Sequence, residues 1–335
     1  MSKRRLSQKQ QSRIQKQHES RLRQAAPQEA DTDTLDVSGI HGLVICNFGQ
    51  HLEVEALDGD RRGEVIRCHQ RSNLPALVCG DRVLWEADGD DAGVVVALEP
   101  RRNVFSRPGF ANELKPVAAN VDKVLIVLAP VPPPHMNLVD RYLVAVETLD
   151  MEPVLVLNKT DLTPDNRPDI DSMLSLYEGI GYPVVHTSAR TGEGIEELRQ
   201  LLHNSTAMIA GQSGVGKSSL INALSPGLAA AVGALSQAID KGTHTTTAVR
   251  LFHAGGYDLI DSPGIREFSL WHVQAEQLLW GFREFRPLLG QCRFRDCRHL
   301  QEPHCALRQA VAQGHVDGRR LDSYFQILQT LRGDL

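Results

Sequence analysis

Short apolar segments with alternating or β-branched residues dominate the chain from about Leu35 to Pro108. Turn residues (Gly, Asp or Asn) separate them, which is typical of consecutive β-strands. The segments are GLVICNF, HLEVEAL, GEVIRCH, DRVLWEA and AGVVVALEP. Five strands in so short a stretch predict a small barrel, best matched by the OB type. Such barrels often hold nucleic acid, although a purely structural barrel stays open as an alternative.

From about Ala118 the pattern changes to buried apolar runs that alternate with helical segments. The apolar runs are VDKVLIVLAP, PVLVLNKTDL, YPVVHTSA and AMIAGQSG. Between them lie the helical segment LVDRYLVAVETLD and predicted helices near 169–179 and 194–203. This alternation predicts a doubly wound parallel sheet. After about Trp271 the pattern becomes helical again, interrupted by a Cys/His cluster at 292–305.

Composition narrows the class of protein. With 41% apolar and 23% charged residues, the 335-residue chain is ordinary for a globular protein. No apolar run is long enough to span a bilayer, and the N-terminus is too polar for a secretory signal. The other three cysteines, Cys46, Cys68 and Cys79, are scattered and do not suggest a disulfide framework. We therefore expect a cytoplasmic protein without membrane association.

Positive charge is concentrated at the N-terminus. The net charge is −5, yet residues 1–24 carry eight Lys or Arg against one Glu. Such an arm is too polar to fold alone, and its charge suits a polyanion. Nucleic acid is the favoured partner, and a solvated tail without a partner is the alternative.

The segment GQSGVGKSS, residues 211–219, fits the phosphate-loop pattern between an apolar strand and a helix. Glycines at such positions let backbone N–H groups turn towards phosphate oxygens, and the helix N-terminus favours negative charge. Lys217 is expected to reach the β- and γ-phosphates, and Ser218 to bind Mg²⁺. The expected phosphate-binding residues are Gly211, Gln212, Ser213, Gly214, Val215, Gly216, Lys217, Ser218 and Ser219.

Two further motifs select the base. NKTD, formed by Asn158, Lys159, Thr160 and Asp161, follows an apolar strand. The Asp161 carboxylate can accept hydrogen bonds from guanine N1–H and from its N2 amino group, a donor pair that adenine lacks. Ser188 and Ala189 in HTSAR resemble the loop whose backbone contacts guanine O6. Together these motifs favour GTP over ATP.

A further pair of segments resembles the switch regions of GTPases. In DSPG, Asp261 is expected to hold Mg²⁺ and Gly264 to meet the γ-phosphate. In the preceding polar run, Thr245 is the first choice for the remaining Mg²⁺ ligand and Thr246 the second.

The order of these motifs is unusual. The base motifs precede the phosphate loop and the switches, whereas in a Ras-like GTPase the phosphate loop and the switches come first. The cyclic order is the same, but the chain is cut at a different point. Because all these loops lie at the carboxyl ends of sheet strands, a circular permutation can preserve the site. The central domain is thus predicted to be a circularly permuted GTPase.

The hydrolytic residue departs from the Ras pattern. Ile265 follows Gly264, where Ras-like enzymes have a glutamine that orients the attacking water. We therefore expect slow intrinsic hydrolysis. Besides Lys217, His244 is the local candidate for a catalytic role once a partner orders its loop. Contact with RNA or solvent is the equally open alternative for this histidine.

A compact Cys/His cluster lies in CRFRDCRHLQEPHC. Cys292, Cys297, His299 and Cys305 suit one structural, tetrahedral Zn²⁺, with a redox cluster or a plain thiol core as alternatives. His304 is a rival ligand, but chelation by it and the adjacent Cys305 is awkward. Nearby arginines and Phe294 suit RNA phosphates and bases, or a solvated basic face.

The expected architecture is multidomain. An N-terminal OB-type β-barrel precedes a central α/β P-loop GTPase domain, circularly permuted, and a mostly helical zinc-binding domain. We place a basic flexible arm at 1–34, the barrel at 35–108, the GTPase domain at 109–270 and the zinc-binding domain at 271–335.

NKTD, TSA, GQSGVGKSSLIN, HTTT, DSPG and the cysteine-rich tail, in this order and over essentially the whole chain, resemble the bacterial RsgA (YjeQ) GTPases. The resemblance implies a GTPase that hydrolyses GTP to GDP and acts in late maturation of the small (30S) ribosomal subunit, stimulated by that subunit. It implies 16S rRNA contact, Zn²⁺, and Mg²⁺ with GTP, and we expect a monomer. An RNA-binding assembly factor that uses GTP mainly as a binding signal stays open. A metabolic or signalling GTPase without ribosome contact finds no support in the arm and tail.

Overall fold

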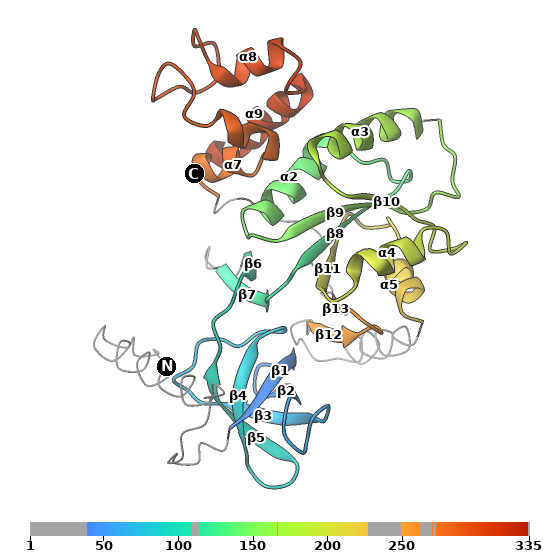
Figure 1. Ribbon diagram of the computed structural model, residues 1–335, viewed down its shortest axis with the longest axis vertical. Helices are drawn as coiled ribbons and strands as arrows, with labels where there is room; N and C mark the ends of the chain where they lie inside the picture. The colour runs from blue at the N-terminus through green and yellow to red at the C-terminus, as the bar shows by residue number, and fades with distance from the viewer. Residues whose placement is uncertain are drawn as a thin grey trace, which may run out of the picture. The chain divides into compact units, whose positions relative to one another are not determined.

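The computed structural model describes residues 39–108, 114–165, 167–226, 249–261, 270 and 273–333 (Figure 1). These residues form two compact units. The first contains the described residues up to 106, together with 114–120 and 249–252. The second contains the described residues 107–108, 121–226, 253–261 and the C-terminal region.

A closed five-stranded barrel is the core of the first unit. Its strands are β1 (Ile40–Asn47), β2 (Leu52–Ala56), β3 (Val65–Gln70), β4 (Arg82–Ala87) and β5 (Ala92–Leu98). They follow the order β1-β2-β3-β5-β4, and β4 pairs with β1 to close the barrel. The β3–β5 pair is parallel and the other pairs are antiparallel. This topology is that of an OB fold, which confirms the sequence prediction.

Trp85 fills the barrel interior and is fully buried. Two glycines make room for its indole, because a Cβ at Gly42 or Gly93 would lie 2.8 or 2.6 Å from the ring. Asp81 is also fully buried, and both of its oxygens accept hydrogen bonds of 2.7 Å from Arg101. Apolar packing and one paired charge thus stabilise the barrel.

Three shorter strands complete the first unit's pairings. β6 (Val104–Pro108) and β7 (Leu114–Ala119) form a separate two-stranded sheet. β12 (Arg250–His253) pairs antiparallel with β1, where Arg250 lies opposite Cys46. Arg250 also contacts the Glu53 carboxylate on β2 at 2.7 Å. The chain therefore returns to the barrel about 150 residues after β5.

A parallel sheet forms the centre of the second unit. Its strands are β8 (Lys123–Leu128), β9 (Glu152–Leu157), β10 (Val184–His186), β11 (Thr206–Ala210) and β13 (Asp258–Asp261). Their order is β10-β9-β8-β11-β13, and every neighbouring pair is parallel. The chain moves outward from β8 through β9 to β10, then starts again on the other side with β11. The carboxyl ends of β8 and β11 therefore define the topological switch point, where doubly wound sheets bind ligands.

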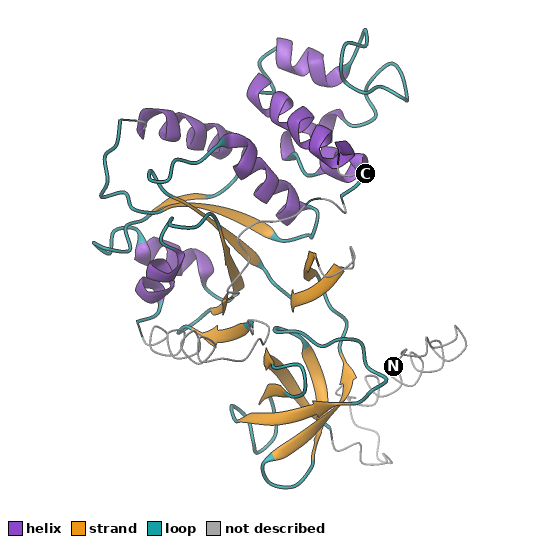
Figure 2. Ribbon diagram, turned by 180° about the vertical axis from the view of Figure 1, so that it is seen from behind, coloured by secondary structure: helices purple, strands orange, loops and turns teal. Residues whose placement is uncertain are grey.

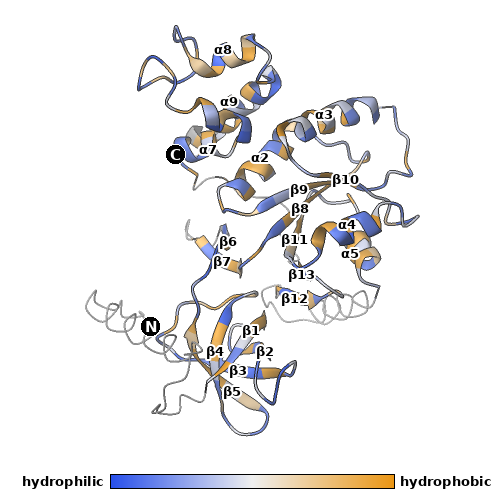
Figure 3. Cartoon of the chain, in the orientation of Figure 1, coloured by the Kyte–Doolittle hydropathy of each residue, from blue (hydrophilic) through white to orange (hydrophobic). Residues whose placement is uncertain are grey.

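Helices cover both faces of this sheet, as Figures 1 and 2 show. They are α2 (Met136–Glu147), α3 (Arg167–Ile180), α4 (Ile195–Leu202) and α5 (Lys217–Leu224). α4 and α5 bury Leu198, Leu220 and Ile221 against Leu125 and Val127 of β8. Figure 3 shows hydrophobic and hydrophilic residues side by side along α2 and α4, as expected for helices with one face on a sheet.

The C-terminal region is helical and belongs to the same unit as the parallel sheet. It contains α7 (Ala275–Trp280), the 3-10 helix η2 (Arg283–Leu288), α8 (Ala306–Ala312) and α9 (Gly318–Gly333). Stacked Phe282 and Phe285, with ring centroids 4.7 Å apart, form its core together with Tyr324. The helical character expected after Trp271 is therefore confirmed.

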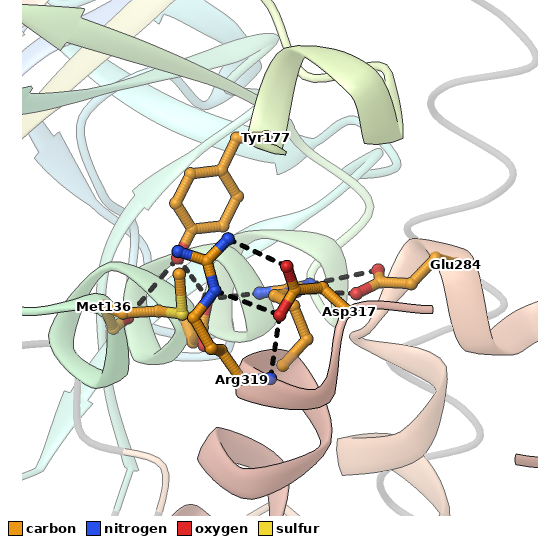
Figure 4. A network of polar contacts seen from close by, with 7 residues as sticks. Met136, Tyr177, Glu284, Asp317 and Arg319 are labelled. Carbon is orange, nitrogen blue, oxygen red and sulfur yellow. Dashed lines mark hydrogen bonds and ion pairs between the residues drawn. The ribbon is translucent and has the colours of Figure 1, made fainter. Parts of the chain in front are cut away.

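A buried ion cluster joins the C-terminal region to α2 and α3 (Figure 4). The Arg320 guanidinium is fully buried, donates to both Glu284 oxygens at 2.6 and 3.0 Å, and contacts Asp140. The Tyr177 hydroxyl donates to the same Asp140 carboxylate at 2.5 Å. At the C-terminal end of α2, Glu147 pairs with Arg283 of η2 at 2.8 Å. Charged side chains of both regions thus fix one against the other.

Among the residues that the structure describes, no helix is both long enough and apolar enough to cross a bilayer.

Candidate functional site

The predicted phosphate loop connects β11 to α5 at the switch point of the sheet. Its three glycines, Gly211, Gly214 and Gly216, have positive φ angles of 140°, 84° and 93°. A Cβ on Gly211 would lie 2.3 Å from the Val127 carbonyl oxygen, and one on Gly216 would lie 2.5 Å from Asn158 Nδ2. These positions therefore require glycine for conformation and for space. The helix starts directly after Gly216, so its N-terminal N–H groups face the loop.

Two lysines are held against this loop. Lys217 Nζ donates to the carbonyl oxygens of Gly211 and Gln212, each at 2.6 Å. Lys159 Nζ, from the base motif, donates to Gly214 at 2.5 Å and to Val131 at 3.1 Å. Both ammonium groups thus lie at the loop, where they can neutralise phosphate charge.

Asn158 connects the base motif to the two other loops. It is buried at the end of β9, and its amide donates to the Val215 carbonyl of the phosphate loop at 3.0 Å. Its Oδ1 accepts the Ala189 N–H at 3.1 Å. The structure therefore brings together three segments that are far apart in the sequence, as the motif reading predicted.

Asp161 has a contact on each carboxylate oxygen. Oδ1 accepts the Ser188 hydroxyl at 2.6 Å, and Oδ2 accepts Arg190 Nε at 2.8 Å. The hydrogen bond from Ser188, followed by the charge of Arg190, lowers the pKa of the Asp161 carboxyl. Thr160, the remaining member of the motif, donates its hydroxyl to Glu193 at 3.0 Å. The Asp161 side chain is therefore ionised and acts only as an acceptor near neutral pH.

The expected magnesium ligands are only partly described. Asp261 ends β13, next to β11 in the sheet, and burial raises the pKa of its carboxyl. Ser218 lies in the first turn of α5 with its side chain exposed. His244, Thr245, Thr246, Gly264 and Ile265 lie outside the described residues.

The remaining residues of the phosphate loop divide into a buried and a solvent-exposed set. Gln212 is half-buried and Val215 is buried, whereas the side chains of Ser213 and Ser219 are exposed. The loop thus has one apolar anchor in the core and a polar outer face.

The four predicted metal ligands converge in the C-terminal region. The ligand atoms of Cys292, Cys297, His299 and Cys305 all lie within 4.8 Å of one another. His299 Nδ1 is 3.6, 3.7 and 3.4 Å from the sulfurs of Cys292, Cys297 and Cys305. The sulfurs of Cys292 and Cys305 are 4.0 Å apart. A tetrahedral Zn²⁺ with ordinary bond lengths needs separations of about 3.6–3.8 Å, so these residues fit such an ion.

The electrostatics of the cluster also suit a cation. Burial lowers the pKa of His299, which leaves the imidazole neutral and able to coordinate a metal. Burial, followed by the neighbouring thiol groups, raises the pKa of Cys297 to about 12. A bound cation would favour the thiolate form instead. His304, the rival ligand, is outside this group, and its carbonyl accepts the Arg293 N–H.

Exposed aromatic and cationic residues lie around the metal cluster. Phe294 is 42% exposed, and the Arg293 guanidinium lies 5.7 Å from its ring centroid. Arg295 and Arg298 are exposed on the same loop. Trp280 is 51% exposed, and the half-buried Arg286 guanidinium, which also pairs with Glu147 of α2, lies 4.8 Å from its ring centroid. Such Arg–aromatic pairs suit the bases and phosphates of RNA.

Sequence reasoning missed two residues that shape the base-binding loops. Arg190, directly after the TSA motif, is the ion-pair partner of Asp161. Gly194 has a φ of 68°, and a Cβ there would lie 1.9 Å from the His186 carbonyl oxygen. The GEG segment after the motif was the available signal for this tight turn.

The doubly wound sheet, the phosphate loop at its switch point and the NKTD loop beside it define a P-loop GTPase fold. Because the base motif precedes the phosphate loop in the chain, the fold is circularly permuted. The RsgA GTPase family model matches residues 98–271. The chain belongs to the RsgA GTPase family and is a GTP hydrolase.

Comparison with individual relatives supports this assignment over the full length. The chain is 52% identical to the small ribosomal subunit biogenesis GTPase RsgA of Azotobacter vinelandii, covering 99% of this chain and 98% of the relative. It is 49% identical to the RsgA of Ectopseudomonas mendocina, and this match covers 100% of this chain and 99% of the relative. The crystal structure of YjeQ from Thermotoga maritima superposes with a TM-score of 0.73 at 33% identity, covering 88% of this chain and 99% of the other. The crystal structure of YloQ, a circularly permuted GTPase, superposes with a TM-score of 0.72 at 29% identity. This match covers 91% of this chain and 99% of the other.

Proposed function

We propose that this protein is a GTPase that binds the small (30S) ribosomal subunit and assists its late maturation. It hydrolyses GTP to GDP with stimulation by the subunit, and its nucleotide state controls association and release. The observation that carries the proposal is the convergence of Asn158, Asp161 and the phosphate loop at one switch point. The partner is inferred from relatives over the whole chain that are named for small-subunit biogenesis.

Guanine recognition is assigned to the base loops. Asp161 accepts guanine N1–H and the N2 amino group, and Lys159 lies along the base. Asn158 fixes the loops, since it bonds both Val215 and Ala189. Ser188 orients the Asp161 carboxylate, and the backbone of Ala189 contacts guanine O6. This assignment predicts strong discrimination against adenine, which has no matching donor pair.

Phosphate binding and hydrolysis are assigned to residues 211–219 and to the two switches. Lys217 stabilises charge on the β- and γ-phosphates. Ser218, Thr245 and Asp261 hold Mg²⁺, which stabilises charge on the phosphate oxygens when bound. The Gly264 N–H meets the γ-phosphate, and His244 orients water when the subunit orders its loop.

The remaining regions are assigned to RNA and to stability. We assign 16S rRNA contact to residues 1–34, to the barrel (35–108) and to the metal-binding domain (271–335), which flank the GTPase domain (109–270) in the sequence. One structural Zn²⁺ at Cys292, Cys297, His299 and Cys305 stabilises the C-terminal loop. We expect a cytoplasmic protein, since maturing subunits are the proposed partner. We also expect a monomer.

Nucleotide binding and co-sedimentation test the proposal together. The purified chain should bind GDP and GTP in preference to ADP and ATP, and Asp161→Asn should shift that preference towards xanthosine diphosphate. Purified 30S subunits should retain the chain with a non-hydrolysable GTP analogue and release it with GDP. Equal binding of ADP, or equal retention with both nucleotides, would contradict the proposal.

A further inference from the structure

Arg190 is a charged residue at the base loops to which the motif reading gives no role. Its side chain is 75% exposed, yet its Nε lies 2.8 Å from Oδ2 of Asp161, whose side chain is only 12% exposed. An exposed arginine gains little from an ordinary surface ion pair. Here, however, the acceptor is the carboxylate assigned to guanine.

The hydrogen-bond capacity of Asp161 leaves room for both partners. An ionised carboxylate offers about four acceptor positions, two on each oxygen. Ser188 uses one on Oδ1 and Arg190 uses one on Oδ2. One position on each oxygen then remains, which is the number that guanine N1–H and the N2 amino group require. Arg190 therefore does not need to leave when guanine binds.

We propose that Arg190 is a positioning residue for guanine recognition, which holds Oδ2 of Asp161 in place and keeps the carboxylate charged when the base covers it. The inference rests on the assignment of Asp161 to guanine made above. Covering a carboxylate with a flat, neutral base removes water and disfavours its charged form. A guanidinium on the outer oxygen offsets that cost.

The other charged residues of these loops are engaged elsewhere. Lys159 donates to the carbonyl oxygens of Val131 and Gly214, and Glu193 accepts the Thr160 hydroxyl. Arg190 is thus the cation that the structure places on the carboxylate.

The local backbone holds Arg190 in this position. Ser188 is fully buried, and its hydroxyl oxygen also accepts the Thr191 N–H at 3.2 Å. Its carbonyl oxygen accepts the Gly192 N–H at 2.8 Å, which closes a tight turn around Arg190. The turn is fixed by groups other than the arginine side chain. Truncating that side chain should therefore leave the loop folded.

The first test measures GDP affinity of single variants by titration with a fluorescent GDP analogue. Arg190→Ala should weaken binding by about two- to fivefold, the range that exposed ion pairs support. Arg190→Lys, which keeps the charge, should recover part of the loss. Arg167→Ala is the matched control, because Arg167 forms a comparable 2.8 Å pair with Asp171 on α3. This control should bind GDP like the unsubstituted chain.

The second test is a double-mutant cycle with Asp161→Asn, measured with xanthosine diphosphate. Because the amide carries no charge, adding Arg190→Ala should change xanthosine diphosphate affinity by less than the single change alters GDP affinity. An equal loss in both backgrounds would mean that Arg190 contacts the nucleotide directly and would overturn the inference. Unchanged or tighter GDP binding by Arg190→Ala would overturn it too. Failure of Asp161→Asn alone to gain xanthosine diphosphate affinity would instead refute the guanine assignment.

Discussion

Arg320→Met should destabilise the chain by about 3–4 kcal/mol at pH 7, because it leaves Asp140 buried without its cation. Asp140 and Arg320 are both fully buried, and only the Tyr177 and Ser323 hydroxyls would remain as partners of the carboxylate. The upper limit of this destabilisation is the free-energy cost of protonating the Asp140 carboxylate. Neutralising a carboxyl of ordinary pKa at pH 7 costs about 4.2 kcal/mol, so the loss at Asp140 should not exceed this value.

The destabilisation should depend on pH in a defined direction. Burial already raises the pKa of Asp140, and loss of Arg320 raises it further. A carboxyl with a folded-state pKa above its unfolded value destabilises the fold increasingly as pH rises above the unfolded value. At pH 5.5 the protonation cost is only about 2.2 kcal/mol. The loss should therefore be smaller at pH 5.5 than at pH 7, by at most about 2 kcal/mol.

Urea denaturation followed by far-UV circular dichroism measures the destabilisation at pH 7 and its change with pH. The matched control is the double variant Arg320→Met with Asp140→Asn, which has no carboxyl to titrate at that position and should lose most of the pH dependence. Glu284 also loses its partner, but its side chain is 11% exposed and reaches water. A loss below about 1 kcal/mol at pH 7 would place the pair in the range of surface ion pairs and refute the reasoning. A loss independent of pH would refute it as well.

Two further predictions concern the candidate sites. Gly216→Ala should weaken GDP binding by more than about tenfold, since its Cβ would lie 2.5 Å from Asn158 Nδ2 at a φ of +93°. Gly214→Ala has the same kind of positive φ (+84°) but its nearest atom would lie 3.7 Å away, so it should cost less, and equal losses in titration calorimetry would contradict the argument from the close contact. Cys305→Ser should reduce bound zinc, measured by elemental analysis, from one ion per chain to a small fraction. Cys79→Ser, a buried cysteine of the barrel, should retain the full ion, and full zinc in both variants would exclude the assigned ligands.

Periodicity predicted most of the fold. The five barrel strands and the parallel sheet are confirmed, because each strand is a contiguous run whose apolar side chains are buried locally. Leu125 and Val127 show this, since both point into the core beneath α4 and α5. Periodicity did not predict β12, a four-residue strand whose partner Cys46 lies about 200 residues earlier. Such a pairing leaves no local pattern.

The sequence also did not predict which charged residues are buried in the interior. Sequence rules place arginine at the surface, yet Arg320 is fully buried, and its partner Asp140 is 180 residues away. The same limit applies to Arg190, because the motif identifies Asp161 but not the side chain that contacts it. Motif spacing predicted the four-residue metal cluster, since all its ligands lie within 14 residues. The domain boundaries and the roles of His244 and Thr245 stay predictions.

Single-turnover GTP hydrolysis, with and without purified 30S subunits, tests the central claim most directly. Because Ile265 cannot orient water, the free chain should be slow, and subunits should raise the rate by more than about tenfold. Lys217→Ala should abolish the stimulated rate, which excludes a contaminating hydrolase. Equal rates with and without subunits would contradict the proposed stimulation and favour an assembly factor that uses GTP mainly as a binding signal.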